Sequence, residues 1–391
     1  MTRLAFIVSH PIQYYAPLYQ RLTTRKDLSI KVFLTWHDGR RAIQDSGFQR
    51  PVAWDVPVME GYDFELVENV SRRPGTHRFF GLRNPALVSR VLAWRPDVVH
   101  VTGWAWCSHL KAMNALHRKG VPILFRGDSH LLDSTRTGPK WWLKKALLGR
   151  IYTWPTAFLV VGSANREYYR AFGVPEDRLF DCPHSIDVRR FAEPAGSYDE
   201  EAARWRTELG ITTEKVVFLF AGKLEAKKQP LEFMQAIVEL AEPTAMGVLV
   251  GNGAQEREIQ ELAGKHPDLF RVLPFQNQSR MPIVYRLGDV FVLPSAYDET
   301  WGLAVNEALA CGRPVLVSDH VGCAQDVVNE SCGRTIPLGQ RDVLVSSMRS
   351  LVEDSEQLSA MRRGASLRAR AFDVGETERM LIHCLESQAW M

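Results

Sequence analysis

Two glutamates flank a glycine within residues 298–310, and their spacing suits an anion held between hydroxyl groups. Glu299 and Glu307 lie on either side of Gly302, directly after an apolar run at 289–294 that predicts a buried strand. A helix that begins there presents unpaired N–H groups to an anion, and the glycine permits close approach. The carboxylates can accept hydrogen bonds from hydroxyls on both sides, which describes a nucleotide-sugar. The alternative is an amphipathic helix with solvated acids.

A pair of lysines follows a second apolar run, at 216–220. Gly222 provides a turn after this run, and Lys223 and Lys228 are five positions apart. Two ammonium groups at the end of a strand suit a diphosphate, because its charge must be neutralised before its bond to a sugar breaks. Ordinary surface lysines are the alternative.

Two later turns are weaker candidates for contacts with the same ligand. Gly251 lies in a Gly-Asn-Gly turn after another apolar run. Phe275 and Gln276 belong to a loop whose backbone is suited to reading the edge of a nucleobase. A plain connecting loop explains this segment equally well.

The elements that must position these residues form two series of alternating strands and helices. Apolar runs typical of buried strands occur at 4–8, 30–35, 98–101, 123–125 and 158–161, and again at 216–220, 247–250, 291–294 and 315–318. Helical patterns between them predict parallel sheets with helices on both faces. We expect an α/β protein with two doubly wound, Rossmann-like domains, in which ligands lie at the carboxyl ends of the strands.

We expect these domains at 1–187 and 188–372, with the acceptor side in the first and the donor-binding residues in the second. A closing helix is expected at 373–391, and packing back on the first domain is one option for it.

Composition narrows the class of protein. The chain has 391 residues, a length typical of two domains, and its net charge of +3 is too small to indicate nucleic-acid binding. We expect neither a membrane span nor a secretory signal, because no apolar run is long enough for the first and no cleavage pattern supports the second. Six scattered cysteines show no metal or redox spacing, so we expect reduced, mostly buried thiols in a cytoplasmic protein.

These motifs resemble those of the retaining glycosyltransferases of family 4, which have the GT-B fold of two domains facing a central cleft. That family has Gly-Arg-Leu after a strand and a lysine five residues beyond the arginine. Gly222, Lys223 and Lys228 are similar, with lysine in place of the arginine. The family's Glu-x7-Glu motif is similar to the stretch from Glu299 to Glu307.

The resemblance implies a nucleotide-sugar donor, no metal ion and no other cofactor. It implies that Glu299 contacts hydroxyls of the donor sugar and that Glu307 holds the ribose diol. The N–H groups of Gly302 and Leu303 would hold the distal phosphate, and the lysine pair would stabilise the departing nucleoside diphosphate. No protein nucleophile is expected, because in most accounts of the family the donor phosphate deprotonates the acceptor.

The acceptor side departs from the family pattern. A Gly-Gly loop often follows the family's first strand, whereas His10, Gln13 and Tyr14 follow the run 4–8 in this chain. An imidazole, an amide and a phenol suit a hydroxyl-rich acceptor. A structural role for His10 is the alternative.

A second acceptor-side loop follows the run 123–125 and contains Asp128 and His130. Relatives carry a histidine or an aspartate near the reacting carbon at this place. The resemblance therefore makes both residues candidates for positioning donor or acceptor hydroxyls. Which of the two faces the cleft stays open, and a loop-stabilising Asp128 is the alternative.

Two basic stretches bear on the acceptor. Residues 138–150 combine tryptophan, leucine and lysine in a pattern that suits an anionic membrane surface. The alternative is a packed helix whose apolar side chains face a sheet while its lysines reach outward. Six arginines and no acid occur between residues 70 and 96. Peripheral membrane contact would suit a lipid-linked acceptor.

We therefore expect a metal-independent, retaining glycosyltransferase. It would move a sugar from a UDP- or GDP-sugar to a saccharide, glycolipid or related acceptor, in building a surface polysaccharide or glycoconjugate. An epimerase of the same fold and a catalytically silent nucleotide-sugar sensor or scaffold are the alternatives. Slow donor hydrolysis without acceptor would separate an enzyme from a sensor.

Overall fold

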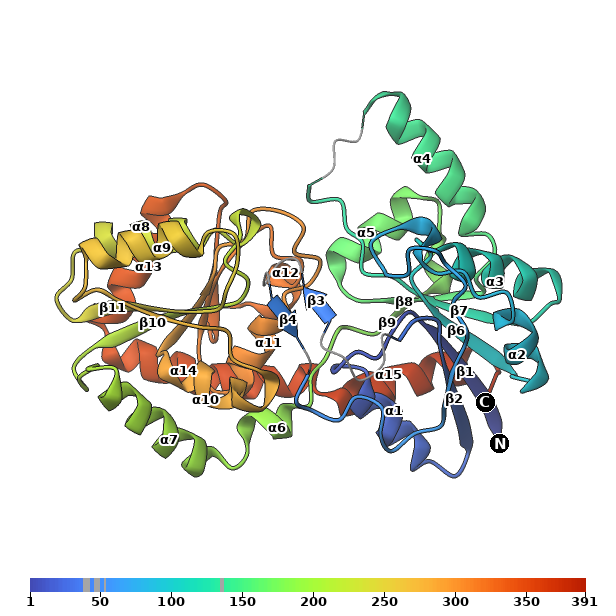
Figure 1. Cartoon of the computed structure of the whole chain (residues 1–391), viewed down its shortest axis with the longest axis horizontal. Helices are drawn as coiled ribbons and strands as arrows, with labels where there is room; N and C mark the ends of the chain where they lie inside the picture. The colour runs from blue at the N-terminus through green and yellow to red at the C-terminus, as the bar shows by residue number, and fades with distance from the viewer. Residues whose placement is uncertain (38–42, 46–49, 53, 134–136) are drawn as a thin grey trace. The chain divides into compact units, whose positions relative to one another are not determined.

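The computed structural model describes residues 1–37, 43–45, 50–52, 54–133 and 137–391, and these divide into two units (Figure 1). Unit 1 holds the described residues of 1–41 together with Pro57–His184 and Val374–Met391. Unit 2 holds the described residues of 42–56 together with Ser185–Asp373. The chain passes from unit 1 to unit 2 after His184 and returns to unit 1 after Asp373.

Unit 1 is built on a parallel sheet of seven strands in the order β5-β2-β1-β6-β7-β8-β9. Its strands are β1 (Thr2–Val8), β2 (Leu28–Leu34), β5 (Phe64–Leu66), β6 (Val98–Thr102), β7 (Ile123–Arg126), β8 (Ala157–Val160) and β9 (Leu179–Asp181). Its main helices are α1 (Ala16–Thr23), α2 (Leu87–Ala93), α3 (Cys107–Arg118), α4 (Gly138–Ile151), α5 (Ser163–Ala171) and α15 (Val374–Ser387). Helices α2, α3, α4 and α5 pack on one face of the sheet, around Phe125 and Phe158.

The closing helix α15 packs on the other face of the sheet of unit 1, beside α1 (Figure 1). Leu381 and Leu385 belong to the same buried cluster as Phe6 of β1. Arg21 of α1 donates from Nε to Glu378 of α15 at 2.8 Å. The last helix of the chain therefore completes the core that the first strand begins.

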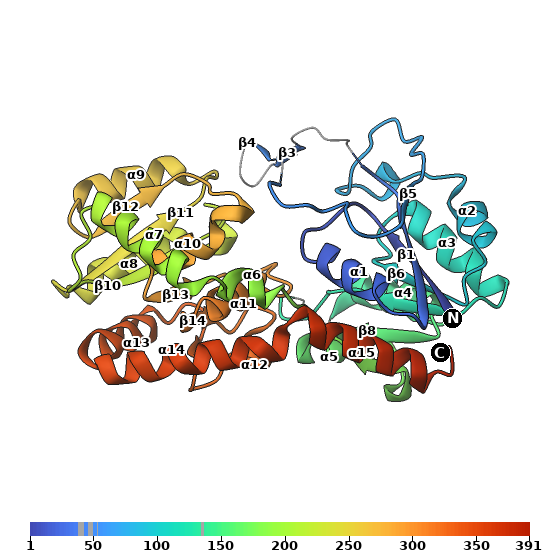
Figure 2. The ribbon, with the colours of Figure 1, turned by 90° about the horizontal axis from the view of Figure 1, so that it is seen from below.

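Unit 2 is built on a parallel sheet of six strands in the order β12-β11-β10-β13-β14-β15. Figure 2 labels its strands from β10 to β14. Its strands are β10 (Val216–Ala221), β11 (Ala245–Val250), β12 (Phe270–Leu273), β13 (Val290–Leu293), β14 (Val315–Ser318) and β15 (Gly333–Ile336). Its main helices are α7 (Ala195–Glu208), α8 (Pro230–Leu240), α9 (Glu256–Lys265), α10 (Met281–Leu287), α11 (Leu303–Ala310), α13 (Arg341–Glu353) and α14 (Ser355–Ala369). Helices α8, α9, α13 and α14 share one buried cluster with Phe218 and Val290, and α10 and α11 contact strands of the sheet as well.

Two Rossmann-like parallel sheets confirm the expected α/β fold class. The short antiparallel pair of β3 (Ile43–Asp45) and β4 (Arg50–Val52) was not expected. All six cysteines are buried and free, as expected of thiols. Among the described helices, none has the length and apolar character of a membrane span.

Candidate functional site

The loop after β13 brings Glu299 into contact with Lys228. The Lys228 ammonium donates to Glu299 Oε2, and the Ser295 hydroxyl donates to the same oxygen at 3.2 Å. The Ala296 N–H donates at 2.8 Å to a backbone carbonyl of the short helix η3 (Ala226–Lys228), which ties the two loops together. The lysine and glutamate side chains are only 17% and 13% exposed. Two of the predicted donor-site residues therefore form one ion pair, mostly shielded from solvent.

Gly302 forms the junction between this loop and α11. Its φ of 94° is left-handed, and a Cβ there would lie 2.8 Å from Cγ1 of Val321, so both the backbone and the space require glycine. Trp301 fixes the junction, because its Nε1 donates to Asn306 Oδ1 at 3.0 Å. The N–H groups of the first turn, including that of Leu303, carry the positive end of the helix dipole. The backbone of this junction is therefore fixed, and a phosphate at its N–H groups stays a prediction.

Glu307 lies inside unit 2, on α11, with 2% of its surface exposed. The Tyr285 hydroxyl on α10 donates to Glu307 Oε2 at 2.6 Å. This contact orients the Glu307 carboxylate, and its role at a ribose stays a prediction. Sequence reasoning missed Tyr285, because nothing in the pattern pairs it with an acid 22 positions away.

The ends of β10, β11 and β12 lie side by side. A Cβ on Gly251 would lie 1.9 Å from the Gly222 carbonyl oxygen, so the neighbouring strand ends require glycine there. Asn252 links the turn after β11 to the loop after β12, because its Oδ1 accepts a hydrogen bond from the Phe275 N–H at 2.8 Å. Gln276 donates from Nε2 to the backbone of its own loop at 3.1 Å. Asn252 was not predicted as a site residue, although the Gly-Asn-Gly turn was a signal for it.

Lys223 lies half-buried in the turn after β10, next to Gly222. Its carbonyl accepts from the Glu225 N–H at 3.0 Å, which closes the turn. Over the described ranges, no group of three or more His, Cys, Asp and Glu side chains could hold a metal ion. Metal independence stays a prediction.

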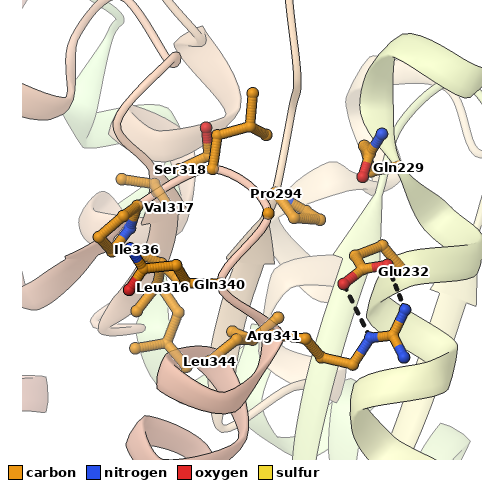
Figure 3. A pocket seen from close by; sticks show the side chains of 13 residues that line it. Gln229, Glu232, Pro294, Leu316, Val317, Ser318, Ile336, Gln340, Arg341 and Leu344 are labelled. Carbon is orange, nitrogen blue, oxygen red and sulfur yellow. Dashed lines mark hydrogen bonds and ion pairs between the residues drawn. The ribbon is translucent and has the colours of Figure 1, made fainter.

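A small pocket of about 20 Å³ lies beside Gln229, the residue that follows Lys228 (Figure 3). Pro294 and Leu316 form part of its apolar wall. At one side, Arg341 donates two hydrogen bonds of 2.8 Å to Glu232. None of the predicted donor-binding residues lines this pocket, so it is distinct from the predicted donor site.

On unit 1, His10 lies at the end of β1 in a mostly buried position. Its Nδ1 lies 2.8 Å from the Ser9 hydroxyl oxygen. Burial, and after it the charge of the nearby His77, lowers the pKa of His10 to about 4. Gln13 and Tyr14 are half-buried in the turn before α1. A neutral imidazole fixed by a hydroxyl fits both the structural and the acceptor-binding hypotheses for His10.

Asp128 and His130 follow β7 and differ in their surroundings. Asp128 is exposed, whereas His130 is half-buried. The Leu132 N–H donates to His130 Nδ1 at 3.2 Å, which holds the ring against its own loop. Its Nε2 is buried and has no hydrogen-bond partner within the part of the chain that the structure describes. The two candidates are therefore not equivalent: one side chain is open to solvent, and the other has a polar atom without a partner.

Arg126, the last residue of β7, was not predicted as a site residue. It is 5% exposed, and its Nη1 donates to the Cys182 carbonyl at 2.9 Å. Its Nη2 lies 3.3 Å from His184 Nδ1, and its guanidinium carbon lies 5.8 Å from the centre of the Tyr15 ring. Burial, and then the charge of Arg126, hold the pKa of His184 well below its usual value. An arginine that ends an apolar run was the signal that sequence reasoning passed over.

Comparisons with known proteins point to one family. The profile described as "Glycosyl transferases group 1" matches residues 201–368, and the profile described as "Glycosyl transferase 4-like domain" matches residues 59–180. A D-inositol 3-phosphate glycosyltransferase of Geodermatophilus obscurus is 30% identical over 379 residues, which cover 88% of this chain and 80% of that protein. A protein of the same name from Xylanimonas cellulosilytica is 30% identical over 212 residues, about half of each chain (52% and 50%).

Solved structures share the fold over the full length of the chain. The Anabaena protein HepE in complex with UDP has a TM-score of 0.73 at 16% identity and covers 99% of this chain and 100% of that one. A glycosyltransferase from Rickettsia africae has a TM-score of 0.76 at 13% identity, with coverages of 99% and 98%. At such low sequence identities, the similarity shows a shared fold and nothing more.

Proposed function

Because this chain belongs to the group 1 glycosyltransferases, we propose that it transfers a sugar from a nucleotide-sugar to a hydroxyl of an acceptor. The observation that carries the proposal is the contact between Lys228, which lies just before α8, and Glu299, which lies in the loop that leads to α11. A sugar diphosphate needs cations and N–H groups at its phosphates and a hydrogen-bond acceptor at its sugar, and this site supplies both.

The positive groups of the site act on the diphosphate. Lys228, Lys223 and the N–H groups at Gly302 stabilise the negative charge that develops as the bond between the anomeric carbon and the phosphate oxygen breaks. Glu299 accepts hydrogen bonds from the donor sugar, and Glu307 accepts them from the ribose. Donor binding thus exchanges the ion pair between Lys228 and Glu299 for contacts with phosphate and sugar.

The proposed reaction retains the anomeric configuration and uses no metal ion and no protein nucleophile. The acceptor hydroxyl attacks on the face from which the diphosphate leaves, and its proton passes to the departing phosphate oxygen. One carbon–oxygen bond breaks and another forms on the same face, so the configuration is kept.

The acceptor in this proposal is a saccharide, glycolipid or related polyol for a surface polysaccharide or glycoconjugate. Its hydroxyls would contact unit 1, with candidate partners at His10, Gln13, Tyr14, Asp128 and His130. The relatives named D-inositol 3-phosphate glycosyltransferases support a polyol acceptor. We place the reaction in the cytoplasm, or at the inner face of the cytoplasmic membrane, where nucleotide-sugars are available.

A thermal-shift panel of UDP, GDP, ADP and their sugars tests the donor. The matching nucleotide raises the melting temperature by mass action, and the others leave it unchanged. Proton NMR of the product with the matching donor then shows whether the anomeric configuration is kept. Tight donor binding without release of nucleoside diphosphate would favour the sensor, and an altered nucleotide-sugar would favour the epimerase.

A further inference from the structure

Helix α4 of unit 1 is attached to its sheet along one side. Leu148 and Ile151 are 0% and 2% exposed and belong to the core around Phe125. The ring of Trp141 packs on that of Phe172, with 5.2 Å between ring centres. In Figure 1 the beginning of α4 stands away from the rest of its unit, while its end meets the other helices. This side of the helix therefore fixes its orientation.

The other side of α4 is apolar and exposed. Trp142, Leu143 and Leu147 are 64%, 72% and 54% exposed. Residues four apart on a helix lie on the same face, so Leu143 and Leu147 form a stripe with Trp142 next to it. Single apolar residues on a surface are ordinary, but a contiguous stripe with a tryptophan indicates a partner.

Cations border this stripe. Lys140, Lys145 and Arg150 are exposed, and Lys145 Nζ lies 5.6 Å from the centre of the Trp142 ring. No acid occurs from residue 138 to residue 166. Two copies of this chain joined through the stripe would bring like charges together without neutralising them, whereas anionic lipid headgroups would neutralise them.

We infer that α4 docks unit 1 on an anionic lipid bilayer. Trp142, Leu143 and Leu147 enter the region between headgroups and acyl chains, and Lys140 and Lys145 lie at the lipid phosphates. Because the packed side of α4 is fixed to the core, the whole unit is oriented on the membrane. The inference does not rest on sugar transfer, since lipid binding needs no donor.

Flotation of the full chain with phosphatidylcholine vesicles, with and without phosphatidylglycerol, tests this inference. We expect the protein to float only with the anionic vesicles, and less as salt rises. Leu143→Asp should weaken binding by about tenfold or more, because an inserted leucine is lost. Lys140→Gln and Lys145→Gln should each weaken it by about fivefold.

Leu367→Asp is the matched control, because Leu367 is a 63% exposed leucine on helix α14 of unit 2. It should float as the wild type does. The inference is overturned if the wild type does not float with anionic vesicles at low salt, or if Leu143→Asp floats equally well. It is also overturned if the stripe instead drives self-association that Leu143→Asp abolishes while vesicle binding is absent. Circular dichroism and the melting temperature verify that each variant is folded.

Discussion

Lys228 and Glu299 neutralise each other in unit 2. In the proposed function, each has a separate task when a sugar diphosphate binds. Sequence reasoning identified both residues, because each follows a strand that ends at the ligand edge of a parallel sheet. It could not show their contact, since 71 positions separate them in the chain. Tyr285 was missed for the same reason, because its partner Glu307 lies on another helix.

Replacing Glu299 separates binding from catalysis. Glu299→Gln keeps the shape of the side chain but releases Lys228 from its ion pair. We expect affinity for the nucleoside diphosphate to stay equal or rise, while kcat falls by about 100-fold, because the donor sugar loses its charged acceptor. Calorimetric titration and initial rates measure the two effects.

Glu225→Gln is the control for this change, because it removes a neighbouring carboxylate that lies 3.6 Å from Lys227. It should leave kcat and affinity close to the wild-type values. Weaker binding of the nucleoside diphosphate to Glu299→Gln would contradict the role assigned to the ion pair.

Removing the hydroxyl of Tyr285 tests the orientation of Glu307. Tyr285→Phe leaves a buried carboxylate without its 2.6 Å hydrogen bond. We expect a loss of about 1–3 kcal/mol in the free energy of unfolding of unit 2, measured by denaturant titration. Tyr297→Phe changes a 48% exposed tyrosine and should cost almost nothing. Equal stability of the two variants would argue against the buried contact.

At the scale of elements, the central strands were predictable and the edge strands were not. Every strand missing from the sequence prediction of the two large sheets is an edge strand: β5, β9, β12 or β15. Central strands are buried on both faces and appear as continuous apolar runs. The edge strands are short and carry polar residues, as in Phe-Glu-Leu of β5 and Gly-Arg-Thr-Ile of β15.

For helix α4, the sequence did not determine which side chains are buried. In the sequence, its tryptophans and leucines fitted either a packed helix or a membrane surface. The structure places some of these side chains on the packed side of the helix and the others on its exposed side. Trp141 and Leu148 face the core, whereas Trp142 and Leu143 face solvent. Which of two adjacent tryptophans is buried depends on where neighbouring helices lie, and local periodicity does not contain that information.

The junction of loop and α11 gives a prediction at this scale. Gly302→Ala combines left-handed backbone strain with a Cβ placed 2.8 Å from Val321. Gly339→Ala has similar backbone strain, with φ 80°, but no atom within 4 Å of the new Cβ. We expect Gly339→Ala to lower stability by about 1–2 kcal/mol and Gly302→Ala by more, with loss of nucleoside diphosphate binding.

Adding Val321→Ala to Gly302→Ala should recover part of the stability, because it relieves the contact and leaves the backbone strain. Melting temperatures and nucleotide titrations of these variants measure the effects. If Gly302→Ala binds nucleoside diphosphate as tightly as Gly339→Ala, the phosphate does not lie at this junction.

At the scale of the whole molecule, the histidines of unit 1 make its stability depend on pH. Burial lowers the pKa of four of them, to about 3 or 4 where a value is resolved: His10, His100, His109 and His184. Between the unfolded pKa of about 6.5 and these values, the unfolded chain binds more protons than the folded one. The stability of unit 1 is therefore lost as pH falls below about 6.5.

For His109 alone the loss at pH 5 is about 2 kcal/mol. Scanning calorimetry at pH 7 and pH 5 should show a lower melting temperature for unit 1 at pH 5. His109→Gln should make the dependence on pH shallower. A melting temperature that stays constant over this range would contradict the buried, neutral state of these histidines.

The division into two units and the parallel sheets were predictable because two series of apolar runs recur along the chain. The placement of β3 and β4 in unit 2 was not predictable, because strands of three residues are too short to form a recognisable apolar run. We propose that unit 2 binds a nucleotide-sugar and that Lys228 stabilises its departing diphosphate.

The most direct measurement is kcat/KM with the best donor, in buffer containing a chelator, for the wild type, Lys228→Ala and Lys227→Ala. Lys227 is the matched control, because it is the neighbouring lysine and pairs with Glu225 rather than Glu299. We predict a fall of about 100-fold or more for Lys228→Ala, because the leaving diphosphate loses a cation, and less than about threefold for Lys227→Ala. A near-normal kcat/KM for Lys228→Ala would contradict the proposed donor site.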